Sequence, residues 1–359
     1  MSFQSGLRKR VQVYNFSFLL FLKYSNTKGS EVPKTLLDVF RRVLTEIPNN
    51  PALKVKRNNQ WQSWTYAQYY SDACDFAKGL ISFGLTPYCS VNIIGFNAPE
   101  WYISFFGSIF GNYLPVGLYT TNNADACKYV SMHSEAELVV VEDKIQLKKY
   151  LKIWKDLPKV KYILIYNDVL PKDLPPEFKD KVILFSEFLK IGRNFKTKDS
   201  EDSLEVRMKK QKPGNCCTLV YTSGTTGPPK AVMISHDNYT WTAAASLYRH
   251  KDKIIFGKER IVSFLPLSHV AAQIIDIVGS LNMGIEVYFA ENTALQGTIL
   301  DTLKEVRPTF FFSVPRLWEK IEEKMKLLGA QSGFVKRGLG NIFLIIFLKF
   351  FLHIILDNS

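Results

Sequence analysis

The ten residues Tyr221–Lys230, YTSGTTGPPK, combine the chemical groups that hold a polyphosphate. Gly224 and Gly227 allow positive φ angles and let the backbone approach a ligand without a Cβ in the way. Side-chain hydroxyls can donate hydrogen bonds to phosphoryl oxygens, and Lys230 adds a positive charge on a flexible stem. The hydroxyls belong to Thr222, Ser223, Thr225 and Thr226. The segment is therefore predicted to be an anion-binding loop.

A cluster of Ser, Thr, Gly and Pro is also typical of a surface turn, and composition alone leaves this alternative open. The flanking residues favour a phosphate site. Cys216–Tyr221 and Ala231–Ile234 are short apolar runs of strand character, and Ser235 is a suitable N-cap for a helix that reaches about His250. Polar glycine loops between buried strands are places where phosphate sites are built.

The loop differs from two other nucleotide-binding motifs. A Walker loop requires GxxxxGK[ST] leading straight into a helix, whereas two prolines separate Gly227 from Lys230 and no Ser or Thr follows the lysine. The chain also lacks GxGxxG, so a dinucleotide-binding fold is unsupported.

Longer segments place the loop in a family. TSGTTGPPKAVMISHDN, which begins at Thr222, resembles the phosphate-loop signature of adenylate-forming enzymes, the acyl-CoA synthetase and luciferase superfamily. FLPLSHVAAQ at Phe264–Gln273 looks like the motif that carries a His beside the acyl carboxylate in that family. PTFFFSVPRLWEK at Pro308–Lys320 resembles a segment of long-chain acyl-CoA synthetases.

Two more segments narrow the resemblance to the bubblegum-type branch: GFNAPEW at Gly95–Trp101 and TNNADACKYV at Thr121–Val130. The similarity extends from about Pro33 to about Arg337. It implies the large N-terminal α/β domain of the adenylate-forming fold, with parallel sheets flanked by helices, in incomplete form. It also implies the activity of a long-chain fatty acid–CoA ligase, which uses ATP, Mg²⁺ and coenzyme A.

The resemblance assigns roles residue by residue. It implies His269 as the catalytic residue, which orients the fatty acid carboxylate or lines the acyl entrance. It implies Thr226 as the Mg²⁺ contact. The residues expected to bind ATP are Thr222, Ser223, Gly224, Thr225, Thr226, Gly227 and Lys230.

The sequence leaves two interpretations open at each of three positions. A lone histidine is more often structural, so only the matching motif favours a site role for His269. Arg316 is interpreted as a helix-start cation, with the border of the acyl pocket as the alternative. Ala231 stands where the family usually has glycine: if that position needs a positive φ, alanine adds strain of about 1 kcal/mol or more, and if it lies in the following strand little changes.

Several later motifs of the family are not found before Ser359: the turn beside the adenine, the Thr-Gly-Asp that holds the ribose, the hinge, and the domain with the catalytic lysine. We therefore expect a truncated, catalytically impaired synthetase that binds ATP weakly. The alternative is a non-catalytic, membrane-associated or dominant-negative partner of the full-length synthetase.

Strand and helix patterns alternate along the chain, which predicts parallel sheets covered by helices. We predict a poorly ordered leader over residues 1–32, a first α/β subdomain over 33–212, a second one with the phosphate loop over 213–337, and an apolar tail over 338–359. Arg193–Lys212, rich in lysine, is predicted to be a connector. The strands that matter below are predicted at Val91–Phe96, Leu114–Leu118, Ala136–Val141, Ile261–Phe264, Ile285–Phe289 and Thr309–Ser313.

The two ends differ from the middle. Arg8–Arg10 precede an apolar run at Phe16–Leu22, as in a signal peptide, but no small-residue cleavage site follows. Secretion and an interfacial anchor are alternatives to the predicted leader. Ile342–Leu356 is apolar, yet Lys349 and His353 interrupt it, and it is shorter than the ~20 residues that span a bilayer. An interfacial helix is the alternative to an atypical tail.

The 359 residues carry a net charge of +13, which could indicate an anionic partner. The lysines of one predicted helix are spaced to lie on its outer side, so a solvated face is favoured over attraction to a membrane surface. These lysines are Lys144, Lys148, Lys149, Lys152 and Lys155. No nucleic-acid motif accompanies the charge, and no nucleic-acid partner is expected.

The five cysteines have no CxxC spacing and are predicted to be reduced core thiols of a cytoplasmic protein. They are Cys74, Cys89, Cys127, Cys216 and Cys217. Peripheral association with intracellular membranes is a further expectation.

Overall fold

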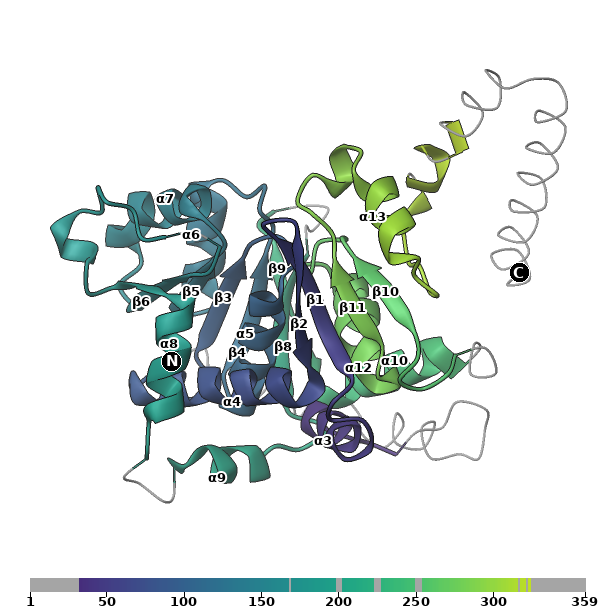
Figure 1. Cartoon of the computed structure of the whole chain (residues 1–359). Helices are drawn as coiled ribbons and strands as arrows, with labels where there is room; N and C mark the ends of the chain where they lie inside the picture. Colours follow the sequence, from purple (N-terminus) through teal and green to yellow (C-terminus); the bar gives the residue numbers. More distant parts are fainter. Residues whose placement is uncertain are drawn as a thin grey trace, which may run out of the picture. The chain divides into compact units, whose positions relative to one another are not determined.

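The computed structural model describes residues 32–167, 169–197, 202–222, 227–248, 254–315, 317–320 and 322–323. The predicted tail, the predicted leader apart from Val32, and Arg316 lie outside the described residues. The chain divides into two compact units, Met1–Phe310 and Phe311–Ser359, and the fold below is that of the first. Two sheets covered by helices make up this unit (Figure 1).

The larger sheet has seven strands in the order β7-β6-β5-β3-β4-β8-β9. Neighbouring strands are parallel except β8 and β9, which form an antiparallel hairpin. In chain order these strands are β3 (Ser90–Ile94), β4 (Leu114–Leu118), β5 (Ala136–Val141), β6 (Tyr162–Ile165), β7 (Val182–Leu184), β8 (Cys216–Thr222) and β9 (Lys230–Ser235).

The smaller sheet has the order β10-β11-β1-β2 and joins residues from both parts of the sequence. The antiparallel strands β1 (Pro51–Arg57) and β2 (Gln60–Thr65) come before the larger sheet in the chain. The parallel strands β10 (Arg260–Ser263) and β11 (Glu286–Phe289) come after it. β1 and β11 pair in parallel, so the chain returns to complete this sheet.

Eleven α-helices of the described residues cover or connect the strands of this unit, together with a π-helix and short 3₁₀ turns. The 3₁₀ turns are Trp154–Asp156, Pro176–Phe178 and Ala294–Gln296. The helices before β8 are α3 (Leu36–Glu46), α4 (Tyr66–Ser82), α5 (Pro99–Phe110), α6 (Ala124–His133), α7 (Lys144–Ile153), α8 (Phe185–Asn194) and α9 (Leu204–Lys209). Those after it are α10 (His236–Tyr248), α11 (Val270–Ala272), the π-helix Gln273–Gly279 (η4), α12 (Ser280–Met283) and α13 (Ile299–Val306).

Helix α5 is buried along its whole length. Its sequence, PEWYISFFGSIF, has no polar face, as expected of a helix with neighbours all round. It contacts β3 and β4 of the larger sheet, β1 of the smaller sheet, and helix α4 (Figure 1). The hydroxyls of Ser104 and Ser108 donate to the carbonyls of Glu100 and Ser104 in the preceding turn, so these buried groups are satisfied within the helix.

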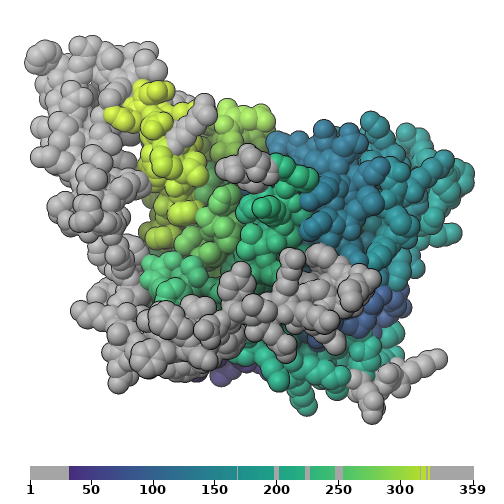
Figure 2. Space-filling model, turned by 180° about the vertical axis from the view of Figure 1, so that it is seen from behind, coloured from purple at the N-terminus to yellow at the C-terminus, as the bar shows by residue number. Residues whose placement is uncertain are grey.

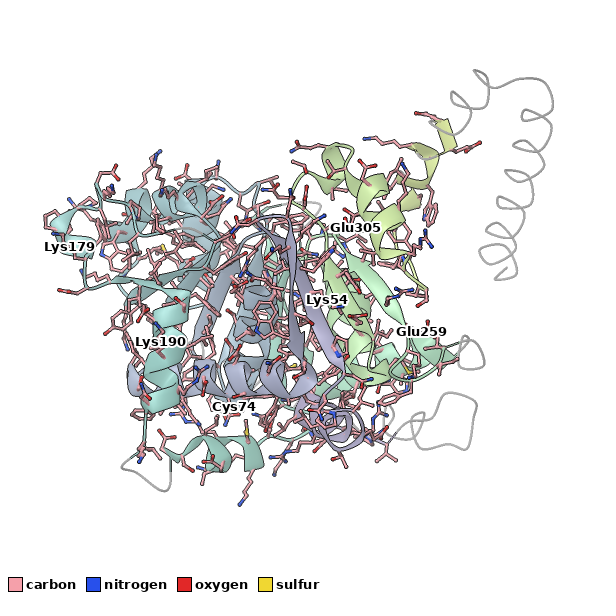
Figure 3. All side chains as sticks on the ribbon, in the orientation of Figure 1. Lys54, Cys74, Lys179, Lys190, Glu259 and Glu305 are labelled. Atoms are coloured by element: carbon pink, nitrogen blue, oxygen red, sulfur yellow. The ribbon has the colours of Figure 1, made fainter. Side chains whose placement is uncertain are left out.

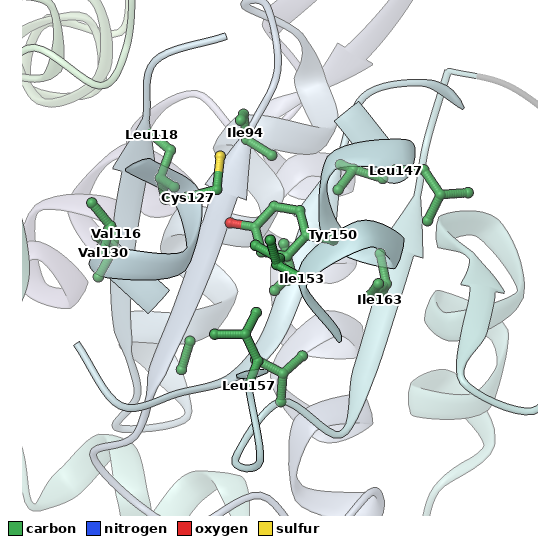
Figure 4. Packing of buried hydrophobic residues seen from close by; sticks show 14 of the residues in the cluster. Ile94, Val116, Leu118, Cys127, Val130, Leu147, Tyr150, Ile153, Leu157 and Ile163 are labelled. Carbon is green, nitrogen blue, oxygen red and sulfur yellow. The ribbon is translucent and has the colours of Figure 1, made fainter. Parts of the chain in front are cut away.

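A second core lies where α6 and α7 pack on strands β3 to β6 (Figure 4). Its side chains include Val116, Cys127, Tyr150 and Ile163, all fully buried. Burial raises the pKa of the Cys127 thiol to about 11, which keeps it protonated. All five cysteines are free thiols, as predicted.

Most predicted elements are confirmed. Strands β4 and β5 have the predicted bounds, and Thr65 caps α4 through a capping box with Gln68. These fully buried strands could be predicted because they are short, mainly apolar runs, interrupted in β5 only by Glu137.

Some expectations need correction. The predicted strand Thr309–Ser313 is wrong, because in the described residues only a single bridge between Ile261 and Phe310 forms there. The predicted connector Arg193–Lys212 contains the end of α8 and helix α9, with buried Leu204 and Met208. The sheets are mixed rather than purely parallel.

The subdomain boundary predicted at residue 212 stays a prediction. The two sheets do not divide the sequence at that residue. Both β8 and β9 join the sheet of the preceding residues, while β1 and β2 join the sheet of the later ones.

The lysines are spread over the surface, but one predicted outer lysine has another role. Lys148, Lys152 and Lys155 are exposed, as are Lys179 and Lys190 on neighbouring elements (Figure 3). Lys149 is partly buried and donates to the carbonyl of Thr120, 2.7 Å away. None of the helices in the described part of the chain combines the length and the apolarity that crossing a bilayer requires.

His236, the first residue of α10, ties that helix to α3. Its Nδ1 accepts a hydrogen bond from the backbone N–H of Leu36 at 3.2 Å, in the first turn of α3. The imidazole is buried, and this burial lowers its pKa to about 4. The ring is therefore neutral at pH 7, with Nδ1 as acceptor.

We expect His236 to contribute to acid sensitivity. Its folded pKa of about 4 lies below the ordinary 6.5, so the unfolded chain takes up a proton there that the folded chain does not. The stabilisation is present above pH 6.5 and is lost as the pH falls toward 4. His236→Asn keeps an acceptor near the position of Nδ1 without titrating. In urea unfolding at several pH values, it should lose less stability on acidification than the wild type.

The control is His236→Leu, which leaves the Leu36 N–H unpaired and should cost about 1–3 kcal/mol at pH 7, where His236 is neutral. Leucine does not titrate either, so this cost should shrink on acidification. Equal acid losses in the wild type and His236→Asn would contradict the assignment.

Candidate functional site

The predicted phosphate loop connects the antiparallel strands β8 and β9. Thr222 and Lys230 form the last strand pair before the loop, and both residues are exposed. This pair is called the base of the hairpin below, because the loop stands on it. Gly227 has φ +87°, with nothing within 4 Å of a Cβ built on it, so glycine is needed there for its backbone angle. Four of the predicted ATP contacts lie outside the described residues: Ser223, Gly224, Thr225 and Thr226.

Ala231 lies in β9, where it pairs with Tyr221. It is absent from the residues with positive φ among those described. Of the two sequence alternatives, the one in which alanine occupies the strand therefore holds, and the departure from glycine adds no backbone strain.

The strand order brings the hairpin next to β4. Val116 of β4 pairs in parallel with Leu219 of β8, so the carboxyl ends of both strands lie at the same edge of the sheet. The chain passes from β3 to its neighbour β4 and then crosses β3 to reach β5 on the other side. Doubly wound sheets bind ligands where the connections diverge in this way, outside the carboxyl ends of the strands.

The segment that precedes His269 crosses this same edge. A Cβ added at Gly117, in β4, would lie 2.8 Å from Cα of Ser268 and 3.4 Å from the carbonyl oxygen of Leu267. Glycine at this position therefore permits the segment to rest directly on the strand. Burial raises the pKa of Tyr119, and a hydrogen bond with Ser268 opposes this shift. Residues 117–119 thus lie against residues 267–268, on the strand next to β8, which ends at Thr222.

His269 is exposed at the start of helix α11 and its side chain caps that helix. Its Nδ1 accepts a hydrogen bond from the backbone N–H of Ala271 at 3.1 Å. Because Nδ1 is the acceptor, the neutral ring carries its proton on Nε2. The sequence-predicted histidine therefore presents a hydrogen-bond donor suited to an anionic oxygen.

Two backbone carbonyls of the segment before His269 are held by buried side chains. Asn97 Nδ2 donates to the carbonyl of Leu265 at 2.8 Å, and Gln273 Nε2 donates to the carbonyl of Leu267 at 2.6 Å. The Tyr239 hydroxyl in turn donates to Gln273 Oε1. These contacts fix the path of the chain into His269.

A buried polar chain links this segment to both sheets. Asn97 Nδ2 also donates to Ser263 Oγ, and Ser263 Oγ donates to Asp276 Oδ2, both at 2.8 Å. The Tyr102 hydroxyl of α5 donates to the backbone carbonyl of Asp276 at 2.9 Å. Burial raises the pKa of Asp276 to about 7, and the hydrogen bond from Ser263 opposes this shift.

Sequence reasoning missed Asn97, Ser263 and Asp276 as parts of this region. A usable signal was Asp276 itself, an acid inside the apolar run IIDIVG. That run forms the π-helix Gln273–Gly279, a rare conformation that often accompanies functional sites.

The described residues contain no group of three or more His, Cys, Asp or Glu side chains that could hold a metal ion. The assignment of Mg²⁺ to Thr226 therefore stays a prediction from the sequence.

Comparison with known proteins places the chain among the proteins described as AMP-binding enzymes, whose family model matches residues 40–341. The long-chain-fatty-acid–CoA ligase ACSBG2 of Xenopus laevis is 45% identical over 308 residues, which cover 85% of this chain and 40% of that protein. The ligase ACSBG1 of Rattus norvegicus is 42% identical, with 86% of this chain and 42% of that protein covered. The chain thus spans about two fifths of the length of these curated relatives.

Solved structures show the same fold. The adenylation domain of a carboxylate reductase from Mycobacterium chelonae has a TM-score of 0.66 at 17% identity, covering 93% of this chain and 55% of that one. The anthranilate CoA ligase AuaEII in complex with anthranoyl-AMP has a TM-score of 0.62 at 20% identity, covering 80% of this chain and 51% of that one. The predicted adenylate-forming α/β fold is confirmed.

We expect Asp276 to lower stability as the pH rises. Its folded pKa of about 7 exceeds the ordinary 3.8, so between these values the folded chain holds a proton that the unfolded chain has released. The associated stability is full below pH 3.8 and is lost as the pH rises through 7, by up to about 1.4 kcal/mol per pH unit. Asp276→Asn keeps the acceptor for Ser263 but does not titrate. Its unfolding free energy relative to the wild type should therefore increase with pH in urea titrations.

A difference between Asp276→Asn and the wild type that stays constant with pH would show that the carboxyl group is ionised in the folded protein throughout.

Proposed function

This chain belongs to the AMP-binding enzyme family, and from that membership we propose that it supplies the phosphate hairpin and the carboxylate-binding segment of an ATP-dependent long-chain fatty acid–CoA ligase. Its relatives at 40–45% identity bear the name long-chain-fatty-acid–CoA ligase. The observation that carries the proposal is that β8, the first strand of the hairpin, and the segment before His269 both lie next to β4, at the edge of the sheet near Gly117.

The chemistry requires these two segments to act on neighbouring groups. A fatty acid carboxylate is a poor acyl donor, because its leaving group would be oxide. In the proposed reaction a carboxylate oxygen attacks the α-phosphorus of ATP, the α–β phosphoanhydride bond breaks, and pyrophosphate leaves. The thiolate of coenzyme A then attacks the acyl carbon, the bond to the phosphate oxygen breaks, and AMP leaves. Both steps depend on charge neutralisation and alignment.

Lys230 is the proposed partner of the ATP phosphates. It stands at the exposed base of the hairpin opposite Thr222, where an ammonium group can offset phosphate charge. Ser223–Thr226 remain sequence-predicted phosphate contacts. Magnesium enters with the nucleotide, as MgATP, and Thr226 is its predicted protein contact.

His269 is the proposed partner of the fatty acid carboxylate. Its Nε2–H is the donor, and the cap that Nδ1 makes with Ala271 fixes the ring. Coenzyme A is the proposed acyl acceptor by analogy with the named activity of the relatives. Cytoplasmic location and peripheral membrane association stay predictions.

We expect Lys230→Met to weaken binding of MgATP to the purified chain about tenfold or more, since hydrogen bonds to charged groups contribute about 1.5–3 kcal/mol. Equilibrium dialysis measures the dissociation constant. Lys148→Met removes the same charge from the exposed side of helix α7 and should leave MgATP binding unchanged. Equal effects of the two substitutions, or no MgATP binding at millimolar concentration by the wild type, would sink the assignment.

We expect His269→Asn to weaken binding of a long-chain fatty acid while preserving helix α11, since an Asn side chain is also a good N-cap. His269→Ala should weaken binding equally and in addition cost about 1 kcal/mol of stability. Displacement of a fluorescent fatty acid measures affinity. A fatty alcohol of the same chain length lacks the carboxylate and should bind equally to the three proteins. A parallel loss of alcohol binding would assign His269 to packing instead.

A further inference from the structure

Helix α6 contacts both strands of the phosphate hairpin. The Tyr129 hydroxyl donates a hydrogen bond to the backbone carbonyl of Pro229 at 2.9 Å. One turn later in the helix, Nδ1 of His133 lies 2.8 Å from the hydroxyl of Tyr221, at the end of β8. In the view from behind, the surface around α6 (blue) adjoins that around β9 (green) (Figure 2). The two contacts therefore join one helix to the two ends of one connection.

The aromatic rings of these residues form a continuous row. Tyr129 and His133 are stacked, with ring centroids 5.6 Å apart and an interplanar angle of 21°. The ring of His133 meets that of Tyr221 edge-on at 5.7 Å. Residues four apart lie on the same face of a helix, so the spacing of Tyr129 and His133 directs both toward the hairpin.

The contact with Pro229 bears directly on Lys230. The carbonyl of Pro229 belongs to the peptide group whose nitrogen is that of Lys230, and this group is planar. A hydrogen bond that orients the carbonyl therefore orients the backbone N–H of Lys230 as well. Pro228 and Pro229 have no N–H of their own to donate, so the chain between Gly227 and Lys230 is positioned through its carbonyls and side chains.

The other contact is partly protected from solvent, on the side of Tyr221. Tyr221 is buried, and its burial raises the pKa of the phenol well above the ordinary value. The hydroxyl thus stays neutral and remains available for a hydrogen bond with His133. Since Tyr221 immediately precedes Thr222, this contact fixes the other end of the hairpin.

We propose that Tyr129 and His133 are positioning residues for the phosphate hairpin, which hold Pro229 and Tyr221 so that Lys230 and Thr222 face the ATP phosphates. This inference rests on the proposed function for its ligand, MgATP. Its structural part, that α6 orders the base of the hairpin, does not need a ligand. The two residues touch no reacting atom and act through the peptide group and the ring that they hold.

Tyr129→Phe tests the inference, because it removes one hydroxyl and keeps the stacked ring. MgATP should bind roughly three- to tenfold more weakly to this variant, the range expected for one hydrogen bond. AMP, which lacks the β- and γ-phosphates, should bind with nearly unchanged affinity. Tyr66→Phe is the matched control. The Tyr66 hydroxyl donates to the backbone carbonyl of Ile285 at 2.8 Å, just before strand β11 of the smaller sheet, and its loss should leave the ratio of MgATP to AMP affinity unchanged.

Hydrogen exchange without nucleotide supplies the second readout. Backbone amides in Lys230–Ser235 should exchange faster in Tyr129→Phe than in the wild type, and Tyr66→Phe should leave them unchanged. His133→Phe keeps an aromatic ring but loses Nδ1, and it should produce the same two effects. The effects of both substitutions combined should be smaller than the sum, because they loosen one hairpin.

The outcomes separate the inference from the proposed function. If Lys230→Met weakens MgATP binding but Tyr129→Phe changes neither affinity nor exchange, the inference is overturned and the proposed function stands. If the wild type binds no MgATP, the proposed function fails together with the ligand named here. Hydrogen exchange then still decides whether α6 orders the hairpin, since equal exchange in Tyr129→Phe and the wild type would overturn that part too.

Discussion

The burial of α5 on every side is the constraint on which the rest of the structure depends. The helix touches β3, β4 and β1, so its diameter sets the separation between the two sheets. Its partner α4 approaches closely enough that a Cβ at Gly107 would lie 2.7 Å from the carbonyl oxygen of Ala73. Because interiors are close-packed, a helix held in this way fixes where the carboxyl ends of the strands meet the segments that cross them.

Hydrogen bonds connect α5 to the candidate site and so position the segment before His269. Tyr102 on α5 reaches the carbonyl of Asp276, and Asp276 is joined through Ser263 to Asn97, which holds the chain before His269. Buried polar groups are costly unless they are paired, so a network of this kind specifies one arrangement of the two sheets. The exposed residues that would meet a ligand, Lys230 and His269, stand on a buried and largely prearranged base.

The features that could be predicted from the sequence are those that depend on short, local patterns of residues. Strands β4 and β5 are mainly apolar runs, Thr65 and Gln68 form a capping box, and the glycine and proline residues mark the hairpin. Sequence reasoning could not find pairings between residues distant in sequence, such as β1 with β11 or Asn97 with Ser263, because no local periodicity reports them. Thr309–Ser313 has the apolar composition of a strand, but tertiary pairing leaves only one bridge. The roles of Ser223–Thr226 as phosphate contacts, and of Thr226 as the Mg²⁺ contact, stay predictions.

The hairpin form of the phosphate loop has an electrostatic consequence. Loops that run from a strand straight into a helix aim the positive end of the helix dipole at a phosphate. Here β9 runs back along β8, and α10 begins beyond Ser235, which pairs with Cys216 at the far end of β8. The N-terminus of that helix therefore cannot serve the loop. Anion binding at the described base of the hairpin must draw on Lys230, an exposed charge, and should for that reason weaken markedly as ionic strength rises.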